Sequence, residues 1–135
     1  LIKNFFSKEE LNVLQKYCYN KLDFNKDYVL DEQSFSPAWY HDALMNSLLN
    51  TKLFKVEEEC NLKLFPTYSY WRYYVYGGTL SKHTDRPACE ISGCEQEHWR
   101  PGVYKGEGMA QVFLHYVNQN GPNKDHAYDQ INKNL

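Results

Sequence analysis

The stretch from residue 62 to residue 78, LKLFPTYSYWRYYVYGG, constrains the fold more than any other part of the chain. It is dense in Tyr, Phe, Trp and Val, which favour strands, and it ends at a Gly-Gly pair. Because side chains alternate along a strand, aromatic rings are expected on both of its faces. One face would carry Tyr68, Tyr70, Arg72, Tyr74 and Tyr76, and the other Ser69, Trp71, Tyr73 and Val75. The pattern predicts a strand that is covered on both sides.

Helices are predicted before this strand, and a further strand after it. Ser7 and Glu10 form a capping-box pattern, and apolar residues then recur at helical spacing. Residues 23–37 favour a loop with at most a short strand. In chain order, we predict a short strand over residues 1–6, helices over about 8–20, 38–50 and 53–60, and strands over 62–76 and 108–117. Helices followed by strands indicate one α+β domain, with N-terminal helices buttressing one sheet of a β-sandwich.

Composition and net charge limit the kinds of partner that the chain is expected to bind. A chain of 135 residues suits a single domain, and a net charge of −2 with no long basic run argues against a nucleic-acid partner. No apolar stretch approaches the length of a membrane span, so no membrane partner is expected. The cysteines are too sparse for a secreted disulfide scaffold, and we expect reduced thiols in a cytoplasm, with two disulfides as the alternative: Cys18, Cys60, Cys89 and Cys94.

A histidine and an aspartate, His83 and Asp85, stand two positions apart beyond the Gly-Gly pair. Side chains at i and i+2 of an extended segment point the same way, so both can face one metal ion. Two histidines and one carboxylate on one face of an ion leave positions open for substrate and oxygen, as in non-haem Fe(II) oxygenases. The third ligand must come from another segment, and the candidates are His41, His98, His115 and His126.

Simpler interpretations stand beside a metal site. A His-x-Asp pair is common by chance. His115 lies in an apolar strand and is expected to be a packed histidine, while His41 and His126 are expected at the surface. Zinc held by Cys89, Cys94, His83 and His98 is a weaker alternative, because the two cysteines have no second close pair to complete a structural site.

Two longer segments place the candidate ligands in a wider pattern: PTYSYWRYYVYGGTLSKHTDRPACEIS and GCEQEHWRPGVYKGEGMAQVFLHYV. A strand that carries Tyr74 leads through a Gly-rich turn to His83 and Asp85, and His98 then precedes a final strand. This order resembles the 2-oxoglutarate/Fe(II)-dependent oxygenases, in particular their prolyl-4-hydroxylase-like branch.

The resemblance implies a double-stranded β-helix (jelly-roll) core and one dioxygenase domain over residues 1–135. His83, Asp85 and His98 would hold Fe(II), and Tyr74 would hydrogen-bond the co-substrate 2-oxoglutarate. The expected reaction hydroxylates an unactivated C–H bond, of a prolyl residue in a peptide or of a small amino-acid-like molecule, with ascorbate as a further candidate cofactor. The alternative is a non-catalytic jelly-roll that binds a partner through its tyrosine-rich face. Convergence of the three ligands would distinguish the two, and the oligomeric state stays open.

The spacing between the motifs departs from the family pattern. Only twelve residues separate Asp85 from His98, and the jelly-roll needs strands between them. Residues 88–92, ACEIS, are strand-like, whereas the sequence after them changes character without a turn. We therefore predict that residues are missing between about 92 and 93.

The source of positive charge for the co-substrate also departs from the pattern. The branch carries a basic residue early on the last strand, where this chain has only Gly108, Met109, Ala110 and Gln111. A carboxylate co-substrate needs a cation, and arginine suits it best. Arg100 shares the strand parity of His98 and is predicted to fill this role. Arg72 is the main competitor and Arg86 a further reserve, although Arg86 is expected to point away from the metal face.

Overall fold

The computed structural model describes residues 3–24, 27–92 and 97–129. Within these ranges the chain forms three α-helices, two antiparallel sheets and two short 3₁₀ helices. In chain order the elements are α1 (Lys8–Phe24), β1 (Val29–Asp31), β2 (Ser36–Tyr40), α2 (Ala43–Thr51), α3 (Leu53–Cys60), β3 (Leu64–Tyr74), β4 (Leu80–His83), η1 (Pro87–Ser92), β5 (His98–Arg100), β6 (Met109–Asn118) and η2 (Lys124–His126).

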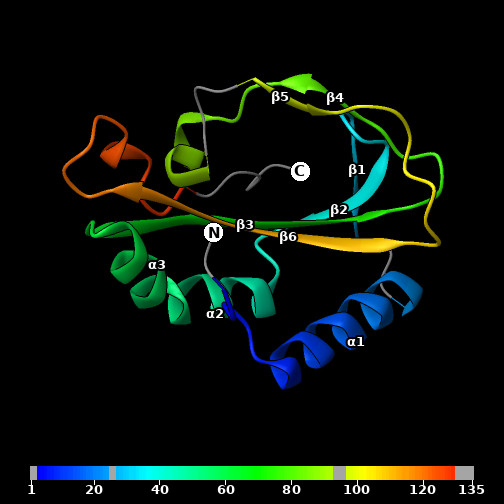
Figure 1. Cartoon of the computed structure of the whole chain (residues 1–135), viewed down its shortest axis with the longest axis horizontal. Helices are drawn as coiled ribbons and strands as arrows, with labels where there is room; N and C mark the ends of the chain where they lie inside the picture. The colour runs from blue at the N-terminus through cyan, green and yellow to red at the C-terminus, as the bar shows by residue number, and fades with distance from the viewer. Residues whose placement is uncertain (1–2, 25–26, 93–96, 130–135) are drawn as a thin grey trace.

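The main sheet has the strand order β1-β2-β3-β6, and β4 pairs with β5 in a second, smaller sheet. All neighbouring strands are antiparallel. Figure 1 shows α1, α2 and α3 along one face of the main sheet, while β4, β5 and η1 lie on its opposite side. The predicted α+β class is therefore confirmed, and the N-terminal helices cover one face of the main sheet.

The central strand, β3, is covered on both faces as its sequence predicts. Every residue from Pro66 to Tyr74 is buried. Trp71 and Tyr73 pack in the cluster on the helix side, whereas Tyr68 and Tyr70 pack on the other side. The period-two alternation thus assigns each ring to a face, and the face that carries Tyr68 and Tyr70 is turned toward the second sheet.

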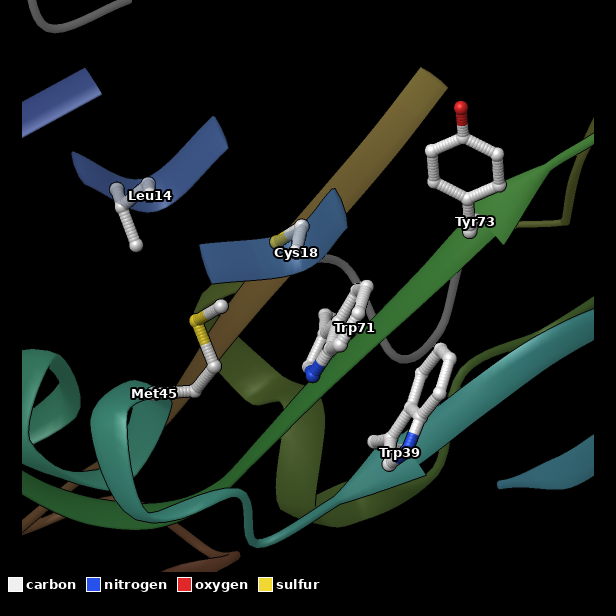
Figure 2. Packing of buried hydrophobic residues seen from close by; sticks show 6 residues of the cluster. All are labelled: Leu14, Cys18, Trp39, Met45, Trp71 and Tyr73. Atoms are coloured by element: carbon white, nitrogen blue, oxygen red, sulfur yellow. The ribbon is translucent and has the colours of Figure 1, made fainter. Parts of the chain in front are cut away.

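The core on the helix side brings together side chains from α1, α2, β2 and β3 (Figure 2): Leu14, Cys18, Met45, Trp39, Trp71 and Tyr73. Trp39 and Trp71 are register partners on β2 and β3, and their rings stack 4.1 Å apart with an interplanar angle of 9°. A buried aromatic side chain removes about 150–250 Å² from water. This ring pair is therefore a large part of what holds the helices to the sheet.

Capping residues fix where the helices begin. The predicted capping box is confirmed, since Ser7 Oγ accepts from Glu10 N at 3.1 Å and Glu10 Oε2 accepts from Ser7 N at 2.7 Å. Helix α1 extends to Phe24, four residues beyond its predicted end. The entering strand predicted over residues 1–6 is wrong for its described part, because residues 3–6 form turns and bends.

The helix predicted over residues 38–50 is wrong at its start. Residues 36–40 form β2, and α2 begins only at Ala43. His41 has a left-handed backbone with φ 53°, which breaks the chain direction, and Asp42 then caps the helix by accepting from Leu44 N and Met45 N. Tyr40, Leu44 and Leu48 stand at helical spacing, but pairing with β3 overrides that signal.

The strand-like segment ACEIS also differs from its prediction. Residues 87–92 form the 3₁₀ helix η1, which begins at Pro87 and includes a hydrogen bond of 2.8 Å from Cys89 N to Arg86 O. Proline has a φ that suits the first turn of a helix, and it cannot donate to a strand ladder. The predicted break between residues 92 and 93 lies outside the described residues.

Candidate metal centre

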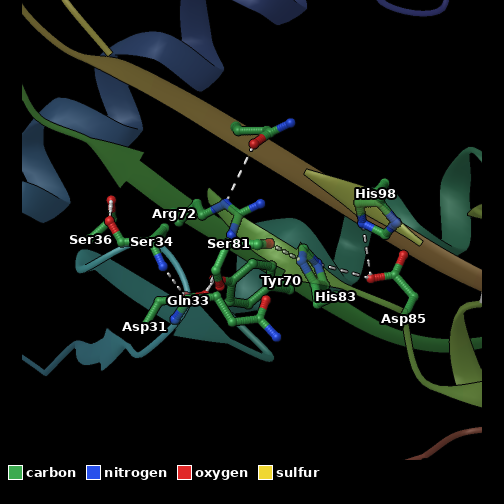
Figure 3. A network of polar contacts seen from close by, with 11 residues as sticks. Asp31, Gln33, Ser34, Ser36, Tyr70, Arg72, Ser81, His83, Asp85 and His98 are labelled. Atoms are coloured by element: carbon green, nitrogen blue, oxygen red, sulfur yellow. Dashed lines mark hydrogen bonds and ion pairs between the residues drawn. The ribbon is translucent and has the colours of Figure 1, made fainter. Parts of the chain in front are cut away.

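Two short strands bring the predicted ligands together. His83 ends β4, His98 begins β5, and the two are register partners in the antiparallel pair. Their rings lie side by side with centroids 4.3 Å apart. Asp85 follows β4 by two residues and reaches both rings (Figure 3). Pairing of β4 with β5 thus places His98 next to the His-x-Asp motif in space, although the two are separated in the sequence.

The spacing of the ligand atoms suits one ion. Asp85 Oδ1 lies 3.7 Å from His83 Nε2 and 3.5 Å from His98 Nε2, and one ligand atom from each residue lies within 4.8 Å of the other two. Ligands about 2.1 Å from an ion and at right angles to one another are about 3 Å apart. Small side-chain movements would bring the three ligand atoms to this spacing, with further positions on the ion left open, and the residues therefore fit a divalent metal.

The hydrogen bond of His83 supports the ligand role. Its Nδ1 lies 2.8 Å from the carbonyl oxygen of Ser81. A carbonyl can only accept, so Nδ1 carries a proton and donates it, and Nε2 is the ring nitrogen on the side of Asp85. A backbone partner on the second ring nitrogen is typical of metal-binding histidines, because it fixes the tautomer and the ring orientation.

A cavity of about 120 Å³ lies between the ligands and β3. Its lining includes all three ligands, the inward-facing Tyr68, Tyr70 and Arg72 of β3, and Arg86 and His115. A larger cavity of about 460 Å³ lies between α1 and β6, on the other side of the sheet, and its lining includes no imidazole or carboxylate. The smaller cavity is therefore the one where metal chemistry and a bound molecule can meet.

A buried charge network forms one wall of this cavity (Figure 3). Asp31 Oδ2 accepts from the Tyr70 hydroxyl and lies 3.5 Å from Arg72 Nη1, while its Oδ1 accepts from the backbone N–H groups of Gln33 and Ser34. Burial alone would raise the pKa of Asp31, but these hydrogen bonds and the Arg72 charge outweigh it and lower the pKa. Asp31 could not be recognised as a site residue from the sequence, because only its Asx-turn contacts, with Gln33 and Ser34, involve residues nearby in the chain.

The two residues predicted to hold the co-substrate lie beside one another. Tyr74 is fully buried, and its hydroxyl has no partner among the described residues. The guanidinium carbon of Arg100 lies 4.4 Å from the centre of the Tyr74 ring, and that of Arg72 lies 5.0 Å from it. Arg72 lines the cavity beside the metal ligands, whereas Arg100 is not among the lining residues. Glu97, three positions before Arg100 in the sequence, pairs with Lys82 at 2.7 Å.

Arg86 faces the cavity, so the prediction that it points away is wrong. Its guanidinium lies over the Tyr68 ring at 5.7 Å and forms an ion pair of 2.7 Å with Asp129. The 3₁₀ turn that follows Asp85 is what redirects it, since strand parity no longer applies there.

The remaining histidines stay outside the ligand group within the described residues. His115 is packed as predicted, against the rings of Tyr68 and Phe113, and burial lowers its pKa to about 4. His126 is half-buried, with 41% of its side chain exposed. His41 is half-buried, which corrects the expectation of a surface residue. In the zinc alternative, Cys94 lies outside the described residues, and Cys89 contacts Tyr68.

Comparison with known proteins adds no relative. We found no match to a family model, a curated protein or a solved structure. Among the helices of residues 3–24, 27–92 and 97–129, none has the length and apolar character needed to cross a membrane. Any functional conclusion must therefore come from the residues and geometry of the site.

Proposed function

We propose that this chain is a 2-oxoglutarate- and Fe(II)-dependent dioxygenase on a double-stranded β-helix fold, similar to the prolyl-4-hydroxylase-like branch. The observation that carries the proposal is the convergence of His83, Asp85 and His98 from two paired strands. Two imidazoles and one carboxylate suit Fe(II) and leave positions open on the ion. The placement of β4 and β5 opposite the main sheet (Figure 1) is compatible with a jelly-roll.

The metal would supply oxygen activation, and the protein supplies geometry and charge. The Ser81 carbonyl orients His83, so that Nε2 faces the ion position. Asp85 Oδ1 lies within 4 Å of Nε2 of both histidines, and its negative charge would offset part of the charge of a divalent ion. The buried rings of β3 exclude water from the opposite wall.

Positive charge for the co-substrate would come from Arg72. Its side chain is 5% exposed, and it lines the same cavity as the ligands. A guanidinium binds a carboxylate through two parallel hydrogen bonds. Asp31 holds this side chain in place and balances part of its charge, as Asp129 does for Arg86. Both arginines line the cavity, and together they would face the two carboxylates of a dianion. Arg100 would then support Tyr74 rather than contact the co-substrate.

The substrate would be a peptide with a prolyl residue or a small amino-acid-like molecule. Tyrosine rings around the cavity suit an apolar ring or chain placed for hydroxylation of its C–H bond. Binding through the tyrosine-rich face alone has less support, because the hydroxyls of Tyr68 and Tyr70 already contact Cys89 and Asp31 inside the protein.

The test is substrate-stimulated decarboxylation of 2-oxoglutarate with Fe(II), across proline peptides and free amino acids. We expect turnover with at least one of these classes, and we expect His83→Ala to abolish it while circular dichroism stays unchanged. His126→Ala is the matched control, since His126 is outside the ligand group and its side chain is 41% exposed, the same fraction as that of His98. Loss of the fold in His83→Ala, or full turnover without added iron, would contradict the proposal.

A further inference from the structure

A thiol and a phenol meet beside the metal cavity, and the proposed reaction uses neither. Cys89 Sγ lies 3.1 Å from the hydroxyl oxygen of Tyr68, and the two residues are 1% and 6% exposed. Neighbouring residues fix the contact, because Thr67 Oγ1 donates to the Ala88 carbonyl at 2.8 Å. This hydrogen bond ties β3 to η1 one residue before each member of the pair.

The pair is close to the place where oxygen chemistry would occur. The Tyr68 ring lines the same cavity as the three metal ligands. Cys89 lies at the kink within η1, which begins two residues after Asp85. Of the other described cysteines, Cys18 packs in the core on the helix side and Cys60 contacts the backbone carbonyl of Glu57. Cys89 is thus the described thiol that an oxidant from this cavity would reach through a neighbouring ring.

The protonated forms of Cys89 and Tyr68 favour loss of hydrogen atoms over binding of the sulfur to the metal. Burial raises the pKa of the Cys89 thiol to about 11, and burial together with the contact to Cys89 raises the pKa of Tyr68 as well. Both groups therefore keep their protons at neutral pH, and Cys89 is not a thiolate that would compete for the metal. The two ring carbons ortho to the hydroxyl are each bonded to the carbon that carries the hydroxyl oxygen. An ortho carbon therefore also lies close to Sγ.

We propose that Cys89 and Tyr68 become joined by a thioether bond when the iron-loaded protein meets oxygen. The S–H bond of Cys89 and one C–H bond of the Tyr68 ring, next to the hydroxyl, break, and one S–C bond forms. The two hydrogen atoms released reduce one O₂ to H₂O₂, so the side chains lose two electrons and oxygen gains two. The bond would tie β3 to η1 and fix one wall of the cavity. This inference rests on the proposed function, because the metal held by His83, Asp85 and His98 activates the oxygen.

The experiment uses the full chain, loaded with Fe(II) without oxygen and then exposed to air. After treatment with reductant and a thiol-alkylating reagent, peptide mass analysis should find the peptides of Tyr68 and Cys89 joined in most molecules, two hydrogen atoms lighter than their sum. Cys89→Ser, Tyr68→Phe and His83→Ala should each lack this species. Cys60→Ser is the matched control and should retain it.

Three results would overturn the thioether. Cys89 that remains fully alkylatable in protein with bound iron would do so, as would a mass loss that reductant reverses, which indicates a disulfide. Added oxygen atoms on Cys89 would indicate sulfur oxidation instead. Decarboxylation of 2-oxoglutarate, measured on the same samples, separates the two proposals: turnover without the cross-link refutes only the thioether, and absence of iron binding refutes both.

Discussion

The guanidinium of Arg72 contacts groups on several strands beside the cavity. It pairs with Asp31, approaches Gln111 Oε1 at 3.4 Å and lies over the rings of Tyr70, Tyr74 and Phe113. A cation held in this way loses little conformational freedom when it binds a carboxylate.

We expect Arg72→Lys to raise the Michaelis constant for 2-oxoglutarate by roughly tenfold to a hundredfold, the range for a hydrogen bond to a charged group of about 1.5–3 kcal/mol. Iron affinity should change little, because Arg72 is not a ligand. Steady-state kinetics and iron titration measure the two effects. Arg100→Ala is the comparison, and a rise for Arg100→Ala alone would return the role to the residue that the sequence favoured.

His115 makes stability depend on pH. Unfolded, it binds a proton near pH 6.5, but the folded protein holds its pKa near 4 because the ring is buried. Between these values the unfolded state binds more protons, so acidification favours unfolding, by about 2 kcal/mol at pH 5. Urea unfolding at pH 7.5 and pH 5 should show that His115→Gln loses less stability than the unmodified chain by about this amount. Equal losses, or the same change in His126→Gln at a half-buried histidine, would contradict the assignment.

Residue chemistry explains which site residues the sequence could predict. His83, Asp85 and His98 stand out because their side-chain types and the i, i+2 spacing suit metal binding. The pairing of Asp31 with Arg72 joins residues 41 positions apart and leaves no local signal. The direction of the Arg86 side chain could not be predicted from the alternation of side chains along a strand, because Arg86 lies in a turn.

Among the secondary-structure elements, α1, α2 and the main sheet are connected to one another at the start of α2. Asp42 caps the helix through its Oδ1, and its Oδ2 accepts from the Tyr17 hydroxyl of α1 at 2.6 Å and lies 3.5 Å from Lys21 Nζ. One carboxylate therefore joins α1, α2 and the end of β2.

We expect Asp42→Ala to lower the free energy of unfolding by about 2 kcal/mol, from a lost cap and a partly buried Tyr17 hydroxyl left without its partner. Ser7→Ala removes a cap at the exposed start of α1 and should cost only about 1 kcal/mol. Denaturant unfolding of the two variants gives the comparison. Equal losses would show that the contacts of Asp42 beyond the cap contribute nothing.

Elements with strong periodic patterns were predictable, and short elements were not. β3 and β6 are long and rich in β-formers, and the capping box marks α1. β2 was hidden because its residues continue the helical spacing of α2. β4 and β5 have four and three residues, too few for a periodic signal, and they exist because they pair with each other.

At the scale of the whole molecule, metal binding links the small sheet to the folded state. The ligands lie on both strands of that sheet and in the segment after β4, so an ion can bind them together only when the strands are paired. A ligand that binds only the folded state stabilises it by mass action.

We expect a divalent metal at about 100 times its dissociation constant to add about 2.7 kcal/mol, which is roughly 10 °C in the melting temperature of a chain of this size. Differential scanning fluorimetry with Fe(II) under nitrogen, or with Co(II), measures the shift, and a chelator should reverse it. His98→Ala should show no shift. A shift that survives this substitution would place the metal elsewhere.

The layer order could be predicted because helices precede strands in the chain and β3 needs cover on both faces. The elements that cover the face of β3 opposite the helices could not be predicted, because the second sheet and η1 come from segments with weak or misleading sequence patterns.

The placement of the three tryptophans has an optical consequence. Trp39 and Trp71 are buried and stacked, whereas Trp99 is 55% exposed and follows the ligand His98 directly. Indole emission responds to the polarity of its surroundings, and nearby paramagnetic ions quench it. The stacked pair would therefore report unfolding of the core by a red shift, while Trp99 would report occupancy of the centre by a loss of intensity. The chain carries its own fluorophores for following the two events separately.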